Sequence, residues 1–299
     1  MIARRFLSMA ALGWLLLSPS GPASAADNVP ASVWNGADMR PVNGLPDGHY
    51  ALDRLSDGTG VAAWYGAPTA RYQHAILGDD IEAGSLHLAF QDGRHYDLFL
   101  PFDQVFEDRT PRIVDLDGDG EIEIVAIRSF QDAGGSVALY GIRDGELREL
   151  AATAPIGRTN RWLNIAGIAD YAGRGSKQIA YVETPHIGGT LHVVNWKGKT
   201  LVPLASLRGF SNHKIGSRHQ DLSADIAWAG KGPPELVVPS NNLRSLRIVG
   251  FSENSLEELD RINLPARVLK RAAPAKGQAP GCVRFRLENG DDATVCPPG

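Results

Sequence analysis

The sequence predicts an all-β fold: a β-propeller of about five four-stranded blades, with a disulfide-bonded hairpin at its C-terminus. Three observations predict it. Similar segments recur along the chain, each repeat alternates short apolar runs with glycine-rich turns, and long helical periodicity is absent. A lone four-stranded sheet leaves two faces and two edges open. Packing such sheets face to face around an axis buries the faces and leaves only short edges.

The repeats are most similar in one strand, which begins with serine or threonine and continues with apolar residues. Its four copies start at Ser85, Ser136, Thr190 and Ser245, which places them 51, 54 and 55 residues apart. A turn and a further strand follow each copy. A second strand pair, joined by a glycine-rich loop, precedes the last three copies. Each unit is therefore expected to contain four strands.

The chain begins with a pattern typical of an exported protein. Residues 1–25 contain Arg4 and Arg5, an apolar run and the small residues Ala23-Ser24-Ala25, so we expect a signal peptide cleaved near Ala25. No later apolar run is long enough for a membrane span. The formal net charge of -4 offers no basic footprint for nucleic acid. The mature protein is expected to be periplasmic or secreted.

Four further segments are expected after the signal peptide. They are 26–60, an N-terminal segment that is a candidate to complete the last blade, 61–264, the blades, 265–281, a basic linker, and 282–299, the hairpin. In the hairpin, Cys282 and Cys296 flank two strand-like runs joined by Asn289-Gly290, a strong turn signal. An oxidising compartment favours a bond between them over two free thiols. A simple two-residue turn would leave the cysteines one position out of register, so the bond requires a bulge or a longer loop.

An acidic loop, residues 115–123, carries the pattern of a calcium site. Side-chain oxygens stand at its positions one, three, five and nine, and a glycine at position six permits a sharp turn. Carboxylates this close together repel one another unless a cation holds them. An EF-hand is excluded because Ala126, inside an apolar run, occupies the position of its twelfth-residue acid. The alternative is a solvated acidic turn. The expected Ca²⁺ ligands are Asp115, Asp117, Asp119, Glu121 through its backbone carbonyl, and Glu123.

This loop and the repeats around it resemble the FG-GAP or VCBS repeat family. The resemblance covers about residues 60 to 260 and is strongest at 113–127. It implies an extracellular propeller with calcium loops between the first two strands of a blade. The next two repeats depart from the pattern, because Arg174 and Lys231 replace acids there, so those loops are expected to bind no calcium. These cations either substitute in part for the ion or are solvated turn residues.

Three polar loops suggest a ligand-binding surface. They are 157–164 and 209–219, which enter the third and fourth blades, and 184–189 within the third. Cations, amides and an aromatic ring suit an acidic glycan, a phosphate-bearing ligand or an acidic loop of a protein. The alternative is that the polar residues cap turns and the tryptophan packs between blades. The candidate ligand-binding residues are Arg158, Arg161, Trp162, His186, His213 and Arg218.

Catalytic signals are poor. The sequence contains no HExxH, GxSxG or phosphate-loop motif. We therefore expect a calcium-stabilised binding or scaffold module for a protein or an acidic glycan, and favour this over an enzyme. The alternative is a propeller hydrolase or lyase that acts on a polyanionic substrate. That alternative would need an acid or base pair converging at the axis, because propeller enzymes draw catalytic groups from separate blades.

Overall fold

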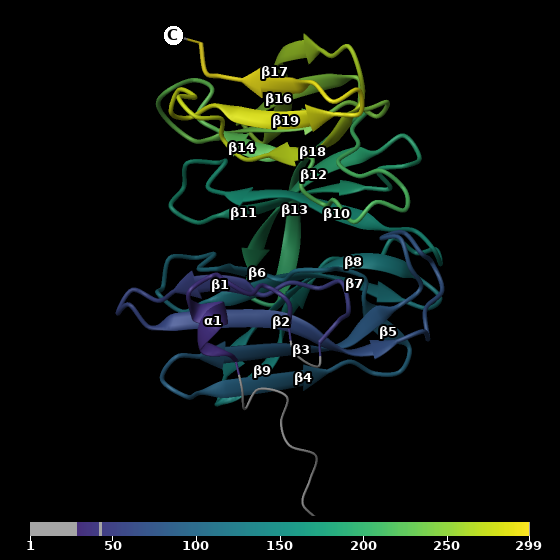
Figure 1. Cartoon of the computed structure of the whole chain (residues 1–299), viewed down its shortest axis with the longest axis vertical. Coiled ribbons are helices and arrows are strands. Elements are labelled where there is room, and N and C mark those ends of the chain that lie inside the picture. Colours follow the sequence, from purple (N-terminus) through teal and green to yellow (C-terminus); the bar gives the residue numbers. More distant parts are fainter. Residues whose placement is uncertain (1–28, 42–43, 299) are drawn as a thin grey trace, which may run out of the picture.

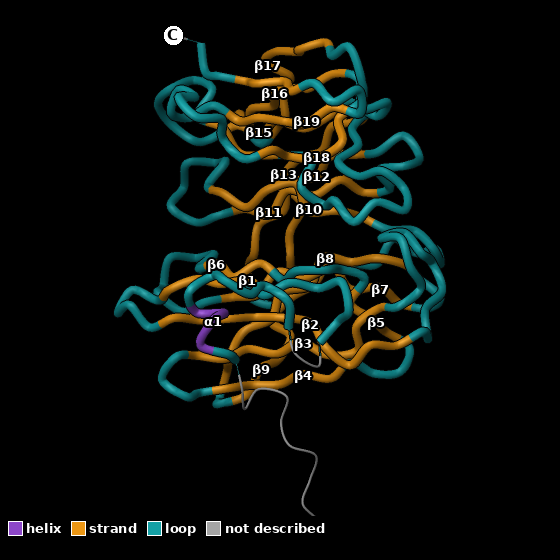
Figure 2. Tube along the Cα trace, in the orientation of Figure 1, coloured by secondary structure: helices purple, strands orange, loops and turns teal. Residues whose placement is uncertain are grey.

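The computed structural model of the chain describes residues 29–41 and 44–298, and this part is almost entirely β-structure (Figure 1). It contains twenty strands and one short helix, α1 (Ala31–Trp34) (Figure 2). The expected signal peptide, 1–25, lies outside the described residues. Among the described residues, no helix has the length and apolar character that a membrane crossing requires. The predicted all-β class is confirmed.

Four antiparallel sheets, each made of four strands that follow one another closely in the chain, form most of the structure. Sheet 1 contains β1 (Ala51–Arg54), β2 (Gly60–Thr69), β3 (Glu82–Phe90) and β4 (His95–Phe99). Sheet 2 contains β6 (Arg112–Val114), β7 (Glu123–Phe130), β8 (Gly134–Arg143) and β9 (Glu146–Ala152). Sheet 3 contains β10 (Leu163–Ala169), β11 (Gln178–Glu183), β12 (Thr190–Lys197) and β13 (Thr200–Arg208). Sheet 4 contains β14 (Ala224–Ile226), β15 (Glu235–Pro239), β16 (Ser245–Ser252) and β17 (Ser255–Asn263).

Two connections join the first three sheets into one hydrogen-bonded network. The short strand β5 (Gln104–Phe106) pairs with both β3 and β7. A single parallel pair, Thr200 with Ala152, joins β13 to β9. Sheet 5 has three strands, β18 (Val268–Ala272), β19 (Val283–Leu287) and β20 (Asp292–Val295).

Two of the expected segments are corrected by the strand pairing. The N-terminal segment does not complete the last blade: β1 pairs with β2, the next strand in the chain, and forms an edge of sheet 1. Strands joined by a short connection commonly pair with each other. Residues 265–281 are not simply a linker, because they contain β18, which pairs with β19. Within β18 only Val268 is fully buried, so the basic composition conceals a strand.

The sheets stack face to face, and a layer of apolar side chains fills each space between consecutive sheets. Strand β8 shows how one strand serves two layers. Val137 and Leu139 lie in the layer shared with sheet 3, whereas Ala138 and Tyr140 lie in the layer shared with sheet 1. Because both faces of such a strand are buried, its sequence is apolar nearly throughout. The same arrangement joins sheet 3 to sheet 4 and sheet 4 to sheet 5.

The stack is open. Sheets 1 and 5 lie near opposite ends of the long axis of the described chain (Figure 1). The apolar layers of the described residues join consecutive sheets, and none joins sheet 1 to sheet 5. The outer face of sheet 1 is covered by the N-terminal segment, where Val33 of α1 packs with Trp64. The described chain therefore has four four-stranded sheets and a fifth of three strands, without ring closure.

The C-terminal disulfide is present between Cys282 and Cys296. Val283 pairs with Val295, so the two cysteines stand directly opposite each other one position further along the strands. The hairpin turn is longer than two residues: the Leu287 N–H donates to the Asp291 carbonyl at 2.8 Å, and Gly290 takes a φ of +91°. The longer loop that the bond requires is therefore what forms.

Candidate functional site

The acidic loop lies between β6 and β7, and its first carboxylate organises its backbone. Asp115 Oδ1 accepts a hydrogen bond from the Gly118 N–H at 2.7 Å, and Asp115 Oδ2 accepts one from the Gly120 N–H at 3.1 Å. Both glycines have positive φ, +82° and +90°, which a residue with a Cβ adopts only at a cost. The chain therefore curls around its own carboxylates.

Three carboxylates meet inside this loop. Asp115, Asp117 and Glu123 each place an oxygen within 4.8 Å of the others. Glu123 is fully buried, and its Oε2 accepts a hydrogen bond from the Leu116 N–H at 3.0 Å. Its Oε1 is buried and has no hydrogen-bond partner, and the nearest cation, Arg143, is 3.6 Å away. An unpartnered carboxylate oxygen facing two other carboxylates matches the ligand set of a hard cation such as Ca²⁺.

The charges around Glu123 also favour a bound cation. Burial first, and then the charges of Asp117 and Asp119, raise the pKa of Glu123 to about 7. Asp119 lies outside the group of three, and its Oδ1 accepts a hydrogen bond from the Glu121 N–H at 2.8 Å. The Glu121 carboxylate pairs with Arg143 at 2.8 Å. The structure thus brings together three of the five expected ligands by their side chains.

Three of the predicted ligand-binding residues form a buried ring cluster. Trp162 is 2% exposed, and its Nε1 donates to the Glu107 carbonyl at 2.9 Å. His186 stacks on it with an interplanar angle of 3°, and the His213 ring lies 4.7 Å from it, centroid to centroid. Trp162 and His213 are buried and His186 is half-buried, so the three rings pack together rather than line an open surface.

The two histidines of this cluster are neutral. His213 Nε2 lies 2.8 Å from the Ser217 carbonyl, which only accepts, so this nitrogen carries the proton. His213 Nδ1 then accepts from His186 Nε2 at 2.9 Å. Burial lowers the pKa of His186 to about 4 and that of His213 to about 3. The pair therefore contributes no positive charge at neutral pH.

The three predicted arginines lie in two different places. Arg158 is exposed and Arg161 is half-buried, and both belong to the loop before β10. Their backbones pack against the start of β8, where the Gly135 N–H donates to the Arg161 carbonyl at 2.8 Å. Arg218 lies instead at the edge of a cavity that neither of them reaches.

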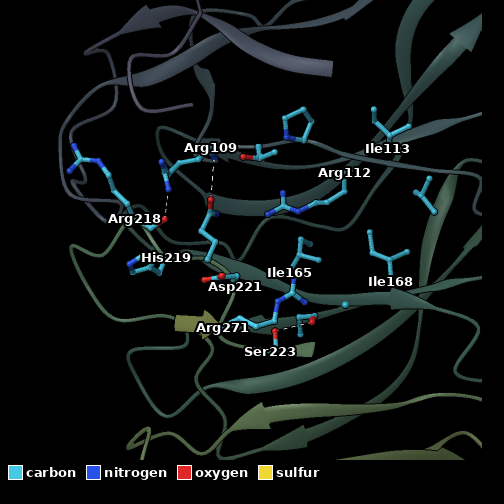
Figure 3. Close-up of a pocket in the computed structure, with 16 residues that line it drawn as sticks. Arg109, Arg112, Ile113, Ile165, Ile168, Arg218, His219, Asp221, Ser223 and Arg271 are labelled. Carbon is cyan, nitrogen blue, oxygen red and sulfur yellow. Dashed lines mark hydrogen bonds between the residues drawn. The ribbon is translucent and has the colours of Figure 1, made fainter. Parts of the chain in front are cut away.

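This cavity, the β6–β10 pocket, has a volume of about 550 Å³ and lies where β6, β10, residues 218–223 and β18 meet (Figure 3). Four arginines from three segments line it, and aliphatic side chains of β6 and β10 form another part of its wall. The arginines are Arg109, Arg112, Arg218 and Arg271. The aliphatic residues include Ile113, Ile165 and Ile168.

Acidic partners hold three of these arginines in place. Arg112 pairs with the fully buried Asp108. Arg109 contacts Asp47 at 2.9 Å, and Arg218 contacts Asp47 at 3.2 Å and Asp79 at 2.6 Å. Arg271 forms no ion pair with any residue that the structure describes. Arg271 does interact at longer range with Asp225, where burial raises the pKa of the carboxyl and the charge of Arg271 opposes that rise. The pocket thus combines three guanidinium groups fixed by ion pairs with one that is not.

Sequence reasoning identified only Arg218 of these four. Arg109 and Arg112 stand just before and at the start of a predicted strand, and Arg271 lies in the segment expected to be a linker. A signal was available in part, because the residues that open corresponding strands of stacked repeats converge in space. His219 and Asp221 also line the pocket and were not singled out.

Comparison with known proteins leaves the family of the chain open. No protein-family model matches the sequence, and no curated protein matches it. Among solved structures, BBS1N, crystallised in complex with ARL6DN, has 12% sequence identity and a TM-score of 0.49, with 84% of this chain covering 65% of that one. The rhamnogalacturonan lyases YesX and YesW each have 14% identity and a TM-score of 0.43. This chain spans 56% of the length of YesX and 57% of that of YesW, through 83% and 82% of its own residues. Because each TM-score is below 0.5, we base no conclusion on these likenesses.

Proposed function

We propose that the protein is an exported, calcium-stabilised binding or scaffold module of the FG-GAP/VCBS propeller type, with a protein or an acidic glycan as its ligand. The observation that carries the binding role is the β6–β10 pocket, where three segments distant in sequence together contribute four arginines. The disulfide and the expected signal peptide support export.

The pocket suits a ligand that bears carboxylates. Arg112 and Arg271 enter it from opposite walls (Figure 3). A guanidinium group can bind a carboxylate with two parallel hydrogen bonds. Ile113 and Ile168 offer an aliphatic surface on which the apolar face of a sugar ring or a side chain can pack. The pairs that Arg109 and Arg218 make with Asp47 keep these groups positioned before the ligand arrives.

Binding can be tested by calorimetry with three probes: oligosaccharides of hexuronic acid, a poly-glutamate peptide and a neutral glucan oligosaccharide. The protein is expected to bind one of the two acidic probes and not the neutral one. Replacing Arg271→Gln should weaken that binding by about tenfold or more, because a charge-assisted hydrogen bond is lost. Arg158→Gln is the matched control, since Arg158 is exposed and lies outside the pocket. Equal affinity for the neutral probe would contradict the proposal.

Calcium is proposed to occupy the acidic loop and to stabilise sheet 2. Asp115, Asp117 and Glu123 would hold the ion through their carboxylates, and the ion would contact the buried Glu123 Oε1, which has no hydrogen-bond donor. Asp117→Ala is expected to weaken calcium binding by at least about tenfold, measured by calorimetry. Asp132→Ala, at an exposed acid outside the loop, is the control. Unchanged affinity in Asp117→Ala would remove the assignment.

A hydrolase or lyase acting on a polyanionic substrate is the second candidate function. The observation that favours it is that His219 and Asp221 line the same pocket as the arginines. An acid and a base beside groups that bind carboxylates are the parts that such chemistry requires. Incubation with hexuronate oligosaccharides, followed by chromatography of the products, tests it. Cleavage that Asp221→Asn abolishes would favour the enzyme, and intact substrate would leave the binding role.

A further inference from the structure

A second cavity, the β16–β17 pocket, lies at one end of sheet 4. It has a volume of about 460 Å³ and forms where the end of β13, residues 240–244 and the paired strands β16 and β17 meet. Its lining contains four arginines, Arg208, Arg244, Arg247 and Arg261, and no acidic side chain. The rest of the lining is mostly amide and hydroxyl groups, so the pocket has almost no apolar wall.

The pairing of β16 with β17 sets two of these arginines against each other. Arg247 is the direct cross-strand partner of Arg261, and Ser245 is the partner of Asn263 two positions away. Side chains two residues apart share a face of a strand, so all four lie on the same face. Like charges directly opposite each other destabilise a strand pair. A compensating negative charge is therefore needed at this face.

One carboxylate supplies part of that charge. Glu258 accepts a hydrogen bond from Arg247 Nε at 2.6 Å and one from Arg261 Nε at 2.6 Å. Arg247 is fixed further, because its Nη1 donates to the carbonyls of Arg208 and Gly209 at 3.0 and 3.1 Å. Its guanidinium group also lies 3.7 Å above the Phe210 ring. The position of Arg247 is thus determined before any ligand binds.

The other two arginines form no ion pair with any acid among the residues that the structure describes. Arg208 and Arg244 are both exposed, and Arg244 Nη1 donates only to the Pro265 carbonyl, at 3.3 Å. Four guanidinium groups therefore converge on one pocket, with the single carboxylate of Glu258 beside them. Glu288 offsets a further part of this charge through a longer-range interaction with Arg244, and a net positive charge remains at the pocket.

We propose that the β16–β17 pocket binds a phosphate or sulfate group. Donors reach the pocket from three segments and so from several directions, which suits a tetrahedral oxyanion better than a planar carboxylate. The lack of an apolar wall suits a ligand that is polar throughout. The β6–β10 pocket shares no lining residue with this one, so the inference stands apart from the proposed function.

Calorimetry at low ionic strength tests the proposal, with inorganic phosphate, inorganic sulfate, glucose 6-phosphate and acetate as probes. The wild-type protein is expected to bind the tetrahedral anions at one site and acetate more weakly. The double variant Arg208→Gln/Arg244→Gln should lose affinity for phosphate by about tenfold or more. Both side chains are exposed, and an unchanged melting temperature would verify that the variant folds. Arg158→Gln, at an exposed arginine outside both pockets, is the matched control and should bind phosphate as the wild type does. Arg271→Gln, in the β6–β10 pocket, is measured beside it.

The outcomes separate this site from the proposed function. Equal affinity for phosphate and glucose 6-phosphate would identify the free anion as ligand, and tighter binding of the ester would identify a phosphorylated sugar; both support the site. Absence of saturable binding, equal affinity for acetate, or unchanged phosphate affinity in the double variant would overturn it. Loss of phosphate binding in Arg271→Gln alone would place the anion in the β6–β10 pocket and also overturn it.

Discussion

Loops 115–123 and 170–178 occupy the same position in consecutive sheets, between the first and second strand. Their backbones are alike. Asp170 Oδ2 accepts from the Gly175 N–H at 2.8 Å, just as Asp115 Oδ2 accepts from the Gly120 N–H. The loops also touch, because the Lys177 N–H donates to the Leu116 carbonyl at 2.7 Å. Two neighbouring repeats thus offer a matched pair.

The loops differ in how their last residue is satisfied. Gln178 Oε1 accepts from the Ala172 N–H at 2.9 Å, and its Nε2 donates to the Ser176 carbonyl at 2.6 Å. Glu123 Oε2 accepts instead from the N–H of Leu116, one position earlier in the loop than the counterpart of Ala172. The Glu123 carboxylate has no proton to donate, and its Oε1 has no hydrogen-bond partner. Ser176 corresponds to Glu121, whose carbonyl is an expected calcium ligand. An amide proton therefore does in one loop what a cation is proposed to do in the other.

Sheet 4 shows a third solution. Glu235 occupies the corresponding place, and its two oxygens accept hydrogen bonds from the Trp228 and Ala229 N–H groups at 2.7 and 3.3 Å. A buried acid there is satisfied by two backbone donors. Of the three residues compared, Glu123, Gln178 and Glu235, only Glu123 has a buried side-chain oxygen without a hydrogen-bond donor.

The largest effect is expected from the ion itself. Calcium at 100 to 1,000 times its dissociation constant should raise the free energy of unfolding of the wild type by about 3 to 4 kcal/mol over the chelated protein. Thermal and denaturant unfolding with calcium and with a chelator measure this. The response should vanish in Asp117→Ala and persist in Asp132→Ala. Identical unfolding curves with and without calcium would contradict the proposal that loop 115–123 binds the ion.

Gln178→Glu should give loop 170–178 a buried carboxylate oxygen without a hydrogen-bond donor, as loop 115–123 has at Glu123. The buried amide proton is lost, and the Ser176 carbonyl then faces an unpartnered carboxylate oxygen. We expect a loss of about 2 to 3 kcal/mol in stability, measured by denaturant unfolding. The control is Gln73→Glu, at an exposed glutamine. A change no larger than in that control would show that the Gln178 bonds contribute nothing.

Glu123→Gln makes the reverse conversion. In the presence of a chelator the variant should be more stable than the wild type by about 1 kcal/mol, because the new amide can donate a hydrogen bond where Glu123 Oε1 has no hydrogen-bond partner. Its stability should no longer respond to calcium. Glu257→Gln, at an exposed strand position, should behave as the wild type. A variant that remains calcium-dependent would mean that Glu123 is not a ligand.

The smallest effect is expected at Arg174, the cation that replaces Asp119 in the second loop. Its guanidinium group is exposed and donates to Asn254 Oδ1 at 3.1 Å rather than to an acid of its own loop. Charge reversal by Arg174→Glu should change stability by less than about 0.5 kcal/mol, as determined from denaturant midpoints. A loss above about 1 kcal/mol would instead support substitution of the ion by this cation.

Much of this comparison was predictable because it is local. The repeat spacing and the alternation of residues such as Val137 and Ala138 predict strands buried on both faces, and the nine-residue loop predicts its own turn. The orphaned oxygen of Glu123 was not predictable, since it depends on which backbone groups come within reach after folding. The same holds for the alternative solution at Gln178, where one side-chain atom decides the outcome.

What escaped prediction depends on packing between distant segments. Trp162 and His213 stand in polar loops, and they are buried because these loops, distant in the sequence, pack against each other. Arg112 and Arg271 are far apart in the sequence and meet in one pocket because sheets 2 and 5 both border it. Strand β18 was hidden by its lysine and its arginine, since an edge strand with one covered face needs few apolar residues. Sequence patterns thus predict secondary-structure elements better than they predict the contacts between distant elements.

The two ends of the open stack are finished differently from its middle. In β19, Phe285 and Leu287 point into the layer shared with sheet 4, whereas Arg286 alternates with them and pairs with Asp292 at 2.5 Å. At the other end, Val33 shields Trp64. An additional copy of the chain would therefore have to desolvate an ion pair or displace a helix to extend the column. The outer faces of sheets 1 and 5 therefore disfavour end-to-end stacking of several copies of the chain into a filament.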